Sequence, residues 1–487
     1  MTNNVDIKKA EKLFFESLEY QKVGNFSKSK ENLIEALKLC PGRESIINNL
    51  IIILFALEES DTLEKLLEEQ NIINQNHLNL INIYILYLRK RFRDCINISL
   101  ESLNSNLGNN DQIIDILIKS FFKLKDSKNV FKFMRLSLRS RNFLDQKYYV
   151  IGLMLFHLGK PQPAKVFFDK AISINKSKIY LYAKSLALLK LREFKNGFEL
   201  LENRFYNYDQ NLIFFKNIPQ IEDLNKIVNK KVVVWYEQGL GDTLNFLKYI
   251  LLLKNFTNQI TFVVQDSLID LLNNFDHDIK IKSYLDAENE SFDFQIPLFS
   301  LVKKLDCNLQ KPIKLKINLS SNANKVDFDS KNLHIAFSYS GNPNYFCDHY
   351  RSIDFDKFKK ILNVNNIHYY KLNKSPLPND VDKNEYTSTD LSHLNIYDIA
   401  LLLNKFDLII STDTVFAHLC GILNINCILL LSKNSDWRWF DDDKKTIWHE
   451  SIRIVKQSNL DDWDKILLLI NRFLRLKSFQ KQKKLKI

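Results

Sequence analysis

Turns recur at a nearly constant spacing through the first 190 residues, and this period constrains the fold more than any other feature of the sequence. The segment KVGNFSKSKENLIEALKLCP places a turn glycine at Gly24, a small residue five positions later and an alanine twelve positions later. HLGKPQPAKVFFDKAISIN repeats this pattern from Gly159. Weaker copies turn near Glu58, Lys90, Lys125 and Arg192. A step of roughly 32 to 35 residues predicts stacked pairs of helices.

Small residues at fixed positions of each copy would let two antiparallel helices approach closely, while large apolar residues fill the groove on the next pair. The period is that of the tetratricopeptide repeat. We therefore expect a tetratricopeptide-repeat array over residues 1–205 and a linker over 206–229. A generic helical bundle is the alternative. Stacked repeats leave a concave surface, which suits a protein or peptide partner.

From Lys230 onward, short apolar runs alternate with helix-like segments. The runs are KKVVVWYEQ, QITFVVQ, NLHIAFSYSG, IHYYKLN, FDLIIST and NCILLLS. This alternation predicts parallel sheets covered by helices on both faces. Because the series restarts at Lys331 after a polar segment, we expect two α/β lobes of Rossmann type, residues 230–330 and 331–470. The predicted fold class is thus multidomain, an all-α repeat superhelix followed by an α/β pair of lobes.

The overall composition is that of a globular protein, with 45% hydrophobic and 26% charged residues. No run approaches the length of a membrane span, and the N-terminus lacks the features of a signal peptide. Six scattered cysteines without a CxxC pair favour reduced thiols, and neither a disulfide framework nor a zinc site is expected. We therefore predict a cytoplasmic protein without a bound metal.

The net charge of +12 is diffuse except in the segment 471–487, where seven Lys and Arg residues follow the last acidic residue. A solvated C-terminal tail is the simplest interpretation. Contact with an anionic membrane surface, which would place the protein at the inner face of the membrane, is the second. Nucleic acid would also suit these cations, but no nucleic-acid-binding motif accompanies them, so none is expected as a partner.

The segment VVVWYEQGLGDTLNF leads from an apolar strand into a helix through Gln238, Gly239, Gly241 and Asp242. Glycines at such a turn let a ligand or a facing lobe approach the backbone. Asp242 would cap the following helix, or its carboxylate would face an interlobe cleft as a general base. Both interpretations stay open. A Walker loop and a dinucleotide fingerprint are excluded, because the residues that they require are missing.

Polar residues also follow the strands of the second expected lobe. One strand ends at Tyr339, Ser340 and Gly341, and a loop then leads to Arg351, whose guanidinium group would suit phosphate oxygens. A surface salt bridge is the simpler role for Arg351.

Another strand ends at Ser411, Asp413 and Thr414, where free amides and hydroxyls at a helix start would form an anion cradle. His418 lies five residues beyond Asp413, and either faces the same cleft or packs in the core.

The loop after the next strand reads SDWRWF and contains Trp437 and Arg438. Trp437, together with Tyr339, would stack on a base or sugar ring, and Arg438 would lie near a phosphate. A local hydrophobic cap, with the arginine stacked on tryptophan, is the alternative.

These segments resemble the bacterial tetratricopeptide-repeat proteins that carry a domain similar to glycosyltransferase family 9, the heptosyltransferase-like family. The similar segments are EFKNGFELLENRF, WYEQGLGDTLNFLKYI, FDFQIPLFSL, AFSYSGNPNYFCDHYRS, DLIISTDTVFAHLCG and NSDWRWF, collinear from Glu193 to Phe440. The resemblance implies a GT-B fold, an inverting reaction that needs no metal or other cofactor, and a nucleoside-diphosphate sugar as donor. It implies that Asp242 is the catalytic base and that Asp413, Thr414 and His418 bind the diphosphate, assisted by Arg351 or Arg438.

The sequence departs from the family pattern at three places. Tyr339 stands where relatives often carry tryptophan, the segment that usually reads Tyr-Glu-Trp-Arg has Leu201 and Asn203 at its first and third positions, and the first lobe is short. The short lobe argues against a heptose acceptor. Two functions remain: transfer of a sugar to a glycan, lipid-linked or protein acceptor, or a non-catalytic repeat scaffold with a ligand-binding GT-B-like module.

Overall fold

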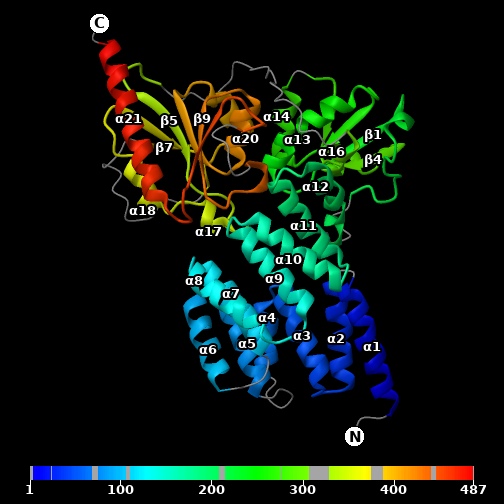
Figure 1. Ribbon diagram of the computed structural model, residues 1–487. Helices are drawn as coiled ribbons and strands as arrows, with labels where there is room; N and C mark the ends of the chain where they lie inside the picture. Colours follow the sequence, from blue (N-terminus) through cyan, green and yellow to red (C-terminus); the bar gives the residue numbers. More distant parts are fainter. Residues whose placement is uncertain are drawn as a thin grey trace. The chain divides into compact units, whose positions relative to one another are not determined.

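A computed structural model describes residues 4–22, 25–68, 75–105, 110–207, 214–275, 277–305, 328–374, 388–439 and 446–485 (Figure 1). The turn expected at Gly24, residues 208–213 of the expected linker, Phe440 and the last two residues lie outside these ranges. The chain divides into two compact units. The first comprises Met1–Met154, Pro163–Ala183 and Asn203–Leu212, and the second comprises Leu155–Gln162, Lys184–Glu202 and Ile213–Ile487. The second unit thus includes the end of the repeat region, Lys184–Glu202, and the expected boundary at residue 205 stays a prediction.

The N-terminal half is helical throughout its described part, as the repeat period predicts. Its helices are α1 (Asn4–Lys22), α2 (Phe26–Leu39), α3 (Glu44–Ala56), α4 (Ser60–Glu68), α5 (Gln75–Leu88), α6 (Phe92–Asn104), α7 (Asn110–Lys123), α8 (Ser127–Ser137), α9 (Leu144–His157), α10 (Pro161–Ile174), α11 (Lys178–Lys190) and α12 (Phe194–Leu201). The small residues of the best-matching copies, such as Ser29, Ala36, Ala164 and Ala171, are fully buried. Small residues at these positions therefore let the helices pack closely, as predicted.

The predicted turns are left-handed at all five positions that the structure describes. Glu58, Lys90, Lys125, Gly159 and Arg192 have φ angles of 58°, 60°, 63°, 70° and 64°. At each turn the next residue donates its N–H to a carbonyl five residues back, as from Glu193 to Leu188 at 2.9 Å. This is the Schellman arrangement that ends a helix. At four of these five turns the left-handed residue is not glycine, so the turn occurs at the repeat spacing even without glycine.

The first lobe contains a four-stranded parallel sheet in the order β3-β2-β1-β4. Its strands are β1 (Val232–Trp235), β2 (Ile260–Val263), β3 (Lys280–Lys282) and β4 (Phe294–Pro297). Helix α13 (Leu240–Leu253) connects β1 to β2. Part of the expected linker also belongs to this lobe, because Gln220 forms a parallel bridge with Gln295 of β4 and Ile227 is fully buried.

The second lobe contains a six-stranded parallel sheet in the order β10-β9-β8-β5-β6-β7. Its strands are β5 (Leu333–Ser338), β6 (Ile367–Lys371), β7 (Ser388–Asp390), β8 (Leu408–Thr412), β9 (Cys427–Leu431) and β10 (Ile452–Lys456). Numbered within the lobe, this order is 3-2-1-4-5-6 read from β7, the doubly wound order of the Rossmann fold. The predicted fold class, repeats followed by two α/β lobes, is confirmed.

Each sheet reverses its strand order at one point, and ligands of such folds bind outside the carboxyl ends of the strands there. The reversal lies between β1 and β4 in the first lobe and between β5 and β8 in the second. The turn that carries Asp242 follows β1, and the segments that carry Gly341 and Thr414 follow β5 and β8. The fold thus places Asp242, Gly341 and Thr414 at the carboxyl ends of strands beside the switch points, and their role in binding stays a prediction.

The basic segment 471–487, expected as a separate tail, is part of helix α21 (Trp463–Leu485) as far as residue 485 (Figure 1). Leu474 of this segment is fully buried in the core of the second lobe. None of the described helices combines the length and apolar character needed to cross a bilayer. The five described cysteines are buried and free, and Cys307 lies outside the described residues.

Candidate functional site at the interlobe contact

The turn after β1 positions Asp242 at the start of α13. Gln238 has a left-handed φ of 58°, and Gly239 is the N-cap residue of the helix. The Gly239 N–H donates to Oδ2 of Asp242 at 3.1 Å, so the carboxylate supplies the N3 half of a capping box, and the glycine has no side chain to supply the other half. The capping role considered from the sequence is therefore present, and the catalytic role stays a prediction.

The second oxygen of Asp242 contacts the other lobe. Arg438, in the 3₁₀ helix Trp437–Trp439, places Nη2 2.5 Å from Oδ1 of Asp242 and Nη1 2.7 Å from Oδ1 of Asp436. Nη2 also donates to Oε1 of Gln238 at 3.2 Å. The Asp242 and Arg438 side chains are 15% and 9% exposed, so this ion pair is largely withdrawn from water. One guanidinium group thus joins acidic residues of both lobes.

These contacts set the charge state of the carboxyl groups. Burial raises the pKa of Asp242 to about 6, although the Arg438 guanidinium opposes this shift. Burial also raises the pKa of Asp413. Burial alone would raise the pKa of Asp436, but Arg438 holds it below its ordinary value. At neutral pH, Asp242 is therefore mainly ionised and close enough to its pKa to exchange a proton.

The segment after β8 forms the second part of the site. Thr414 is the N-cap residue of α20 (Val415–Ile422), and its hydroxyl lies 2.9 Å from that of Ser411. Among the described residues, the buried hydroxyl of Thr412 has no hydrogen-bond partner, and neither has that of Ser338 at the end of the neighbouring strand β5. The helix start and these hydroxyls lie at the switch point, and binding of an anion there stays a prediction.

Asp413 faces the same region but is engaged by protein groups. Its Oδ1 accepts a hydrogen bond from Nε1 of Trp439 at 2.7 Å, and its carbonyl accepts one from Nη1 of Arg351 at 3.3 Å. Asp413 therefore orients the groups around the cradle.

Arg351 lies across the backbone of Gly341. A Cβ atom at Gly341 would come within 2.6 Å of Nη2 of Arg351, so only glycine leaves room for the guanidinium group in this position. Nε of Arg351 donates to Oδ1 of Asp348 at 2.8 Å, and the Gly341 N–H donates to Oγ of Ser352 at 2.9 Å. The loop after β5 is thus arranged to hold Arg351 over the strand end.

We expect Gly341→Ala to weaken nucleoside-diphosphate binding about tenfold with little loss of stability, because the new methyl group displaces a flexible side chain. Isothermal titration would measure the affinity and thermal unfolding the stability. Arg351→Gln should have a similar effect, and the double variant should be no weaker than Arg351→Gln alone. If the losses of affinity in the two single variants added up in the double variant, Gly341 would affect binding independently of Arg351.

His418 is packed between the lobes. A Cβ atom at Gly241 would come within 2.6 Å of its Cδ2, and its ring stacks on Trp439 with 4.8 Å between centroids. Burial lowers the pKa of His418 to about 3, so the ring is neutral at physiological pH. Its Nδ1 is buried and has no hydrogen-bond partner in the part of the chain that the structure describes. The packing role considered for this residue is therefore present, and its role toward a ligand stays a prediction.

Tyr339 and Trp437 do not present ring faces at the surface. Tyr339 is 5% exposed and packs against Phe355 and Phe358 in the core of the second lobe. Trp437 is 3% exposed and packs edge-on against Phe198. Trp437 therefore belongs to a local hydrophobic cap, the alternative considered from the sequence. Cζ of Arg438 lies 4.7 Å from the centroid of its ring. Ser340 accepts a hydrogen bond from Asn373 at 2.9 Å.

The structure adds Lys190 to the site, which the sequence analysis missed. Lys190 ends α11 and is 5% exposed. Its Nζ donates to the carbonyl of Ser435 at 2.6 Å, to Oγ of Ser435 at 3.0 Å and to the carbonyl of Asp436 at 3.1 Å. Lys190 thereby fixes the loop that presents Asp436 and Arg438. No local pattern signals this role, because the partners are 245 residues away in the chain.

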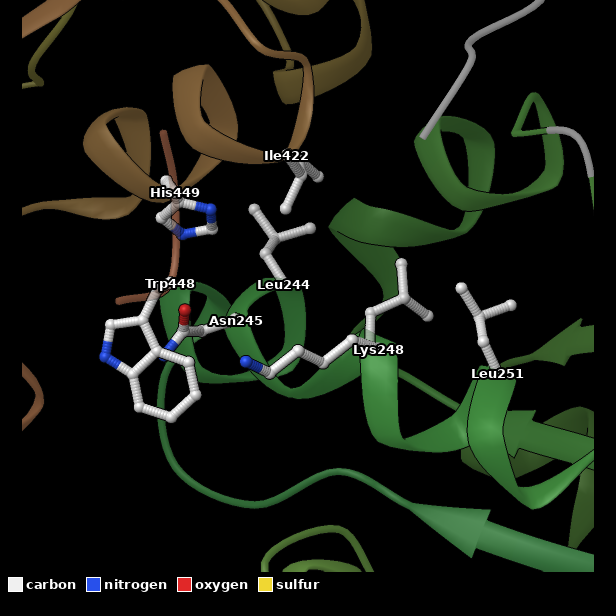
Figure 2. A pocket seen from close by; sticks show the side chains of 8 residues that line it. Leu244, Asn245, Lys248, Leu251, Ile422, Trp448 and His449 are labelled. Atoms are coloured by element: carbon white, nitrogen blue, oxygen red, sulfur yellow. The ribbon is translucent and has the colours of Figure 1, made fainter. Parts of the chain in front are cut away.

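A small pocket, partly open to solvent, lies farther along α13 (Figure 2). Lys248 extends from α13 toward Asn245 and Trp448, and its Nζ lies 4.3 Å from the centroid of the Trp448 ring. Burial lowers the pKa of Lys248 to about 8. The side-chain nitrogen and oxygen atoms of Asn245 and His449 are buried and have no hydrogen-bond partners within the described ranges of the chain. Water or a small polar group in this pocket would satisfy them.

A family model for the tetratricopeptide repeat matches residues 148–178. A search of curated proteins found no match. Among solved structures, a family 9 glycosyl transferase from Veillonella parvula is 9% identical, with a TM-score of 0.36, covering 52% of this chain and 98% of that chain. The Escherichia coli ADP-heptose lipopolysaccharide heptosyltransferase II is 10% identical, with a TM-score of 0.34, covering 51% and 99%.

The O-GlcNAc transferase of Thermobaculum terrenum is 10% identical, with a TM-score of 0.32, and the match covers 99% of this chain and 94% of that chain. Identities and scores this low do not assign an activity. The repeat match confirms the interpretation of the N-terminal half.

Proposed function

We propose that this protein is a glycosyltransferase that moves a sugar from a nucleoside-diphosphate donor to a hydroxyl group of a glycan, lipid-linked or protein acceptor. The observation that carries the proposal is the ion pair between Asp242 of the first lobe and Arg438 of the second, at 2.5 Å. The carboxylate has a pKa of about 6, which suits a general base, and the ion pair connects it to the groups that we propose bind an anion. Both lie at the switch points of the two parallel sheets.

In the proposed reaction, Asp242 removes the proton of the acceptor hydroxyl as its oxygen attacks the anomeric carbon. The new C–O bond forms opposite the bond to the phosphate, which breaks, so the configuration inverts and the nucleoside diphosphate leaves with the bonding electrons. The carboxylate has unused lone pairs for this step, since each of its oxygens has one polar contact, to the Gly239 N–H or to Arg438, among the described residues. Positioned general bases contribute about 100- to 10,000-fold to a rate.

The leaving diphosphate would bind to the start of α20, to Arg351 and to Arg438. Nε of Arg438 supports this assignment, because it is a buried donor without an acceptor in the described part of the chain. An ordered phosphate oxygen would complete its hydrogen bonding. Two guanidinium groups and helix amides would stabilise the developing negative charge, which is why we propose a reaction without a metal ion.

The repeats would bind the acceptor or a protein or peptide partner, as stacked helical pairs commonly do. One observation favours the second candidate function, a non-catalytic scaffold. Both oxygens of Asp242 are already bonded to protein groups, and Tyr339 and Trp437 are covered. A scaffold of this kind would use the α/β lobes only to bind a ligand or to support the repeats.

Thermal unfolding with ADP, GDP, CDP, UDP and TDP, with and without EDTA, tests donor binding. One of these diphosphates, at about 100 times its Kd, should increase the free energy of unfolding of the second unit by about 2.7 kcal/mol. The increase should be the same in EDTA. Arg351→Gln should reduce this stabilisation. Arg453→Gln, a change at an exposed arginine of β10, should not. No stabilisation by any of the five would contradict the proposal and favour the scaffold.

A further inference from the structure

The outward face of α21 combines exposed apolar side chains with basic ones. Four large apolar residues on it are more than half exposed, at 53%, 56%, 64% and 69%: Leu468, Leu469, Leu476 and Phe479. With 100° of rotation per residue, they share an arc of roughly 120° with Arg472 and Arg475. We call these six residues the outer face of α21. Helix α21 therefore has two apolar sides, a buried side and the exposed outer face.

The opposite side of α21 fixes the helix to the second lobe. Trp463, Ile466, Leu467, Ile470 and Leu474 belong to the buried core. Nearer the C-terminus, Oγ of Ser478 donates to the carbonyl of Asn365 at 2.8 Å, and Nε2 of Gln482 donates to that of Lys331 at 2.6 Å. The outer face is therefore presented by a supported helix and is not a frayed end.

The charge of the outer face is uncompensated. No acidic residue follows Asp464 in the sequence. Lys481, at the edge of the helix, lies 3.2 Å from a carboxylate oxygen of Asp407. Arg472 and Arg475 form no ion pair with any carboxylate of the described residues, and Nε of Arg475 donates to the amide oxygen of Asn471. The face is thus apolar and positively charged.

We propose that the outer face of α21 binds an anionic membrane surface, with its apolar side chains in the headgroup region and its arginines at lipid phosphates. Apolar residues flanked by cations on one helix face match this surface in both chemistry and charge. Contact with a second copy would bring like charges together. Nucleic acid would satisfy the arginines but leave the four apolar side chains in water. The proposal does not depend on sugar transfer.

Co-sedimentation of the full chain with vesicles tests the proposal. We expect binding to phosphatidylcholine vesicles that contain about one third phosphatidylglycerol, and little to phosphatidylcholine alone. Arg472→Gln/Arg475→Gln should lower the partition coefficient about 20- to 30-fold, since each cation near such a surface contributes about fivefold. Leu476→Gln/Phe479→Gln should lower it at least about tenfold. Salt at about 0.5 M should weaken binding relative to about 0.1 M.

Matched changes on the first lobe serve as controls. Lys226→Gln/Lys280→Gln removes the same charge from exposed positions, and Leu285→Gln removes an apolar side chain that is 72% exposed. Neither should alter vesicle binding. Equal binding to both vesicle types, or equal losses in control and α21 variants, would overturn the proposal. So would a dimer in light scattering that Leu476→Gln/Phe479→Gln converts to a monomer, or binding to a DNA duplex without binding to vesicles.

Discussion

Asp242→Asn is expected to lower the rate of sugar transfer by about 100- to 10,000-fold, because asparagine cannot accept the acceptor's proton. Its amide has nearly the same shape as the carboxylate, and its oxygen can still accept the N–H of Gly239. Nucleoside-diphosphate affinity should therefore change only a few-fold. Initial rates with a donor found from the diphosphate screen would measure the first effect, and isothermal titration the second.

The same variant separates the two interpretations of Asp242. If it lost diphosphate binding together with activity, the carboxylate would act as a structural cap and not as a base. A matched control is Asp266→Asn, which removes a carboxylate from another helix start of the first lobe, the 3₁₀ helix Asp266–Leu268. This control should retain the activity of the unaltered protein.

The pH dependence of the reaction should report the environment of Asp242. Its pKa is raised to about 6 by burial, with the neighbouring Asp436 and Asp413 acting in the same direction and Arg438 and the Gly239 N–H opposing them. Because the base must be ionised, kcat/KM should increase with pH through about 6 and level off above about 7. A rate profile without an acidic limb near 6, or one centred near 4, would contradict the assignment.

Arg438→Met is expected to reduce the free energy of unfolding of the second unit by about 3 to 5 kcal/mol. The arginine is paired with Asp242 at 2.5 Å and Asp436 at 2.7 Å, and methionine would leave both largely buried carboxylates without their cation. Chemical denaturation would measure the loss. Since Arg438 lowers the pKa of Asp242, any residual activity should show its acidic limb at higher pH.

Two further variants test the cause of this destabilisation. Arg453→Met, at an exposed arginine of β10, should change stability by less than about 0.5 kcal/mol. Arg438→Met/Asp436→Asn should be less unstable than the sum of the two single changes, because the second change removes one of the stranded charges. Strict additivity would show that Arg438 acts mainly through packing.

Much of the architecture was predictable because its signals are local. The repeat turns at Glu58, Lys90, Lys125 and Arg192 were located from spacing alone, and all have left-handed backbones. The six long apolar runs correspond to β1, β2, β5, β6, β8 and β9. The sequence analysis missed β3, β4, β7 and β10. These strands are short or mix polar with apolar residues, as in Lys280–Lys282, so hydrogen bonding to a neighbouring strand defines them more than composition does.

The sequence by itself determined which residues lie at strand ends, since strand, turn and helix are encoded within a few residues of one another. Asp242, Gly341 and Thr414 were placed at the correct edges for this reason. Only the tertiary structure decided what each side chain contacts. The pairing of Asp242 with Arg438, the contacts of Lys190 with the loop at Ser435 and the burial of Tyr339 all join segments far apart in the chain. Such partners leave no periodic trace in the sequence, because packing of the lobes brings them together.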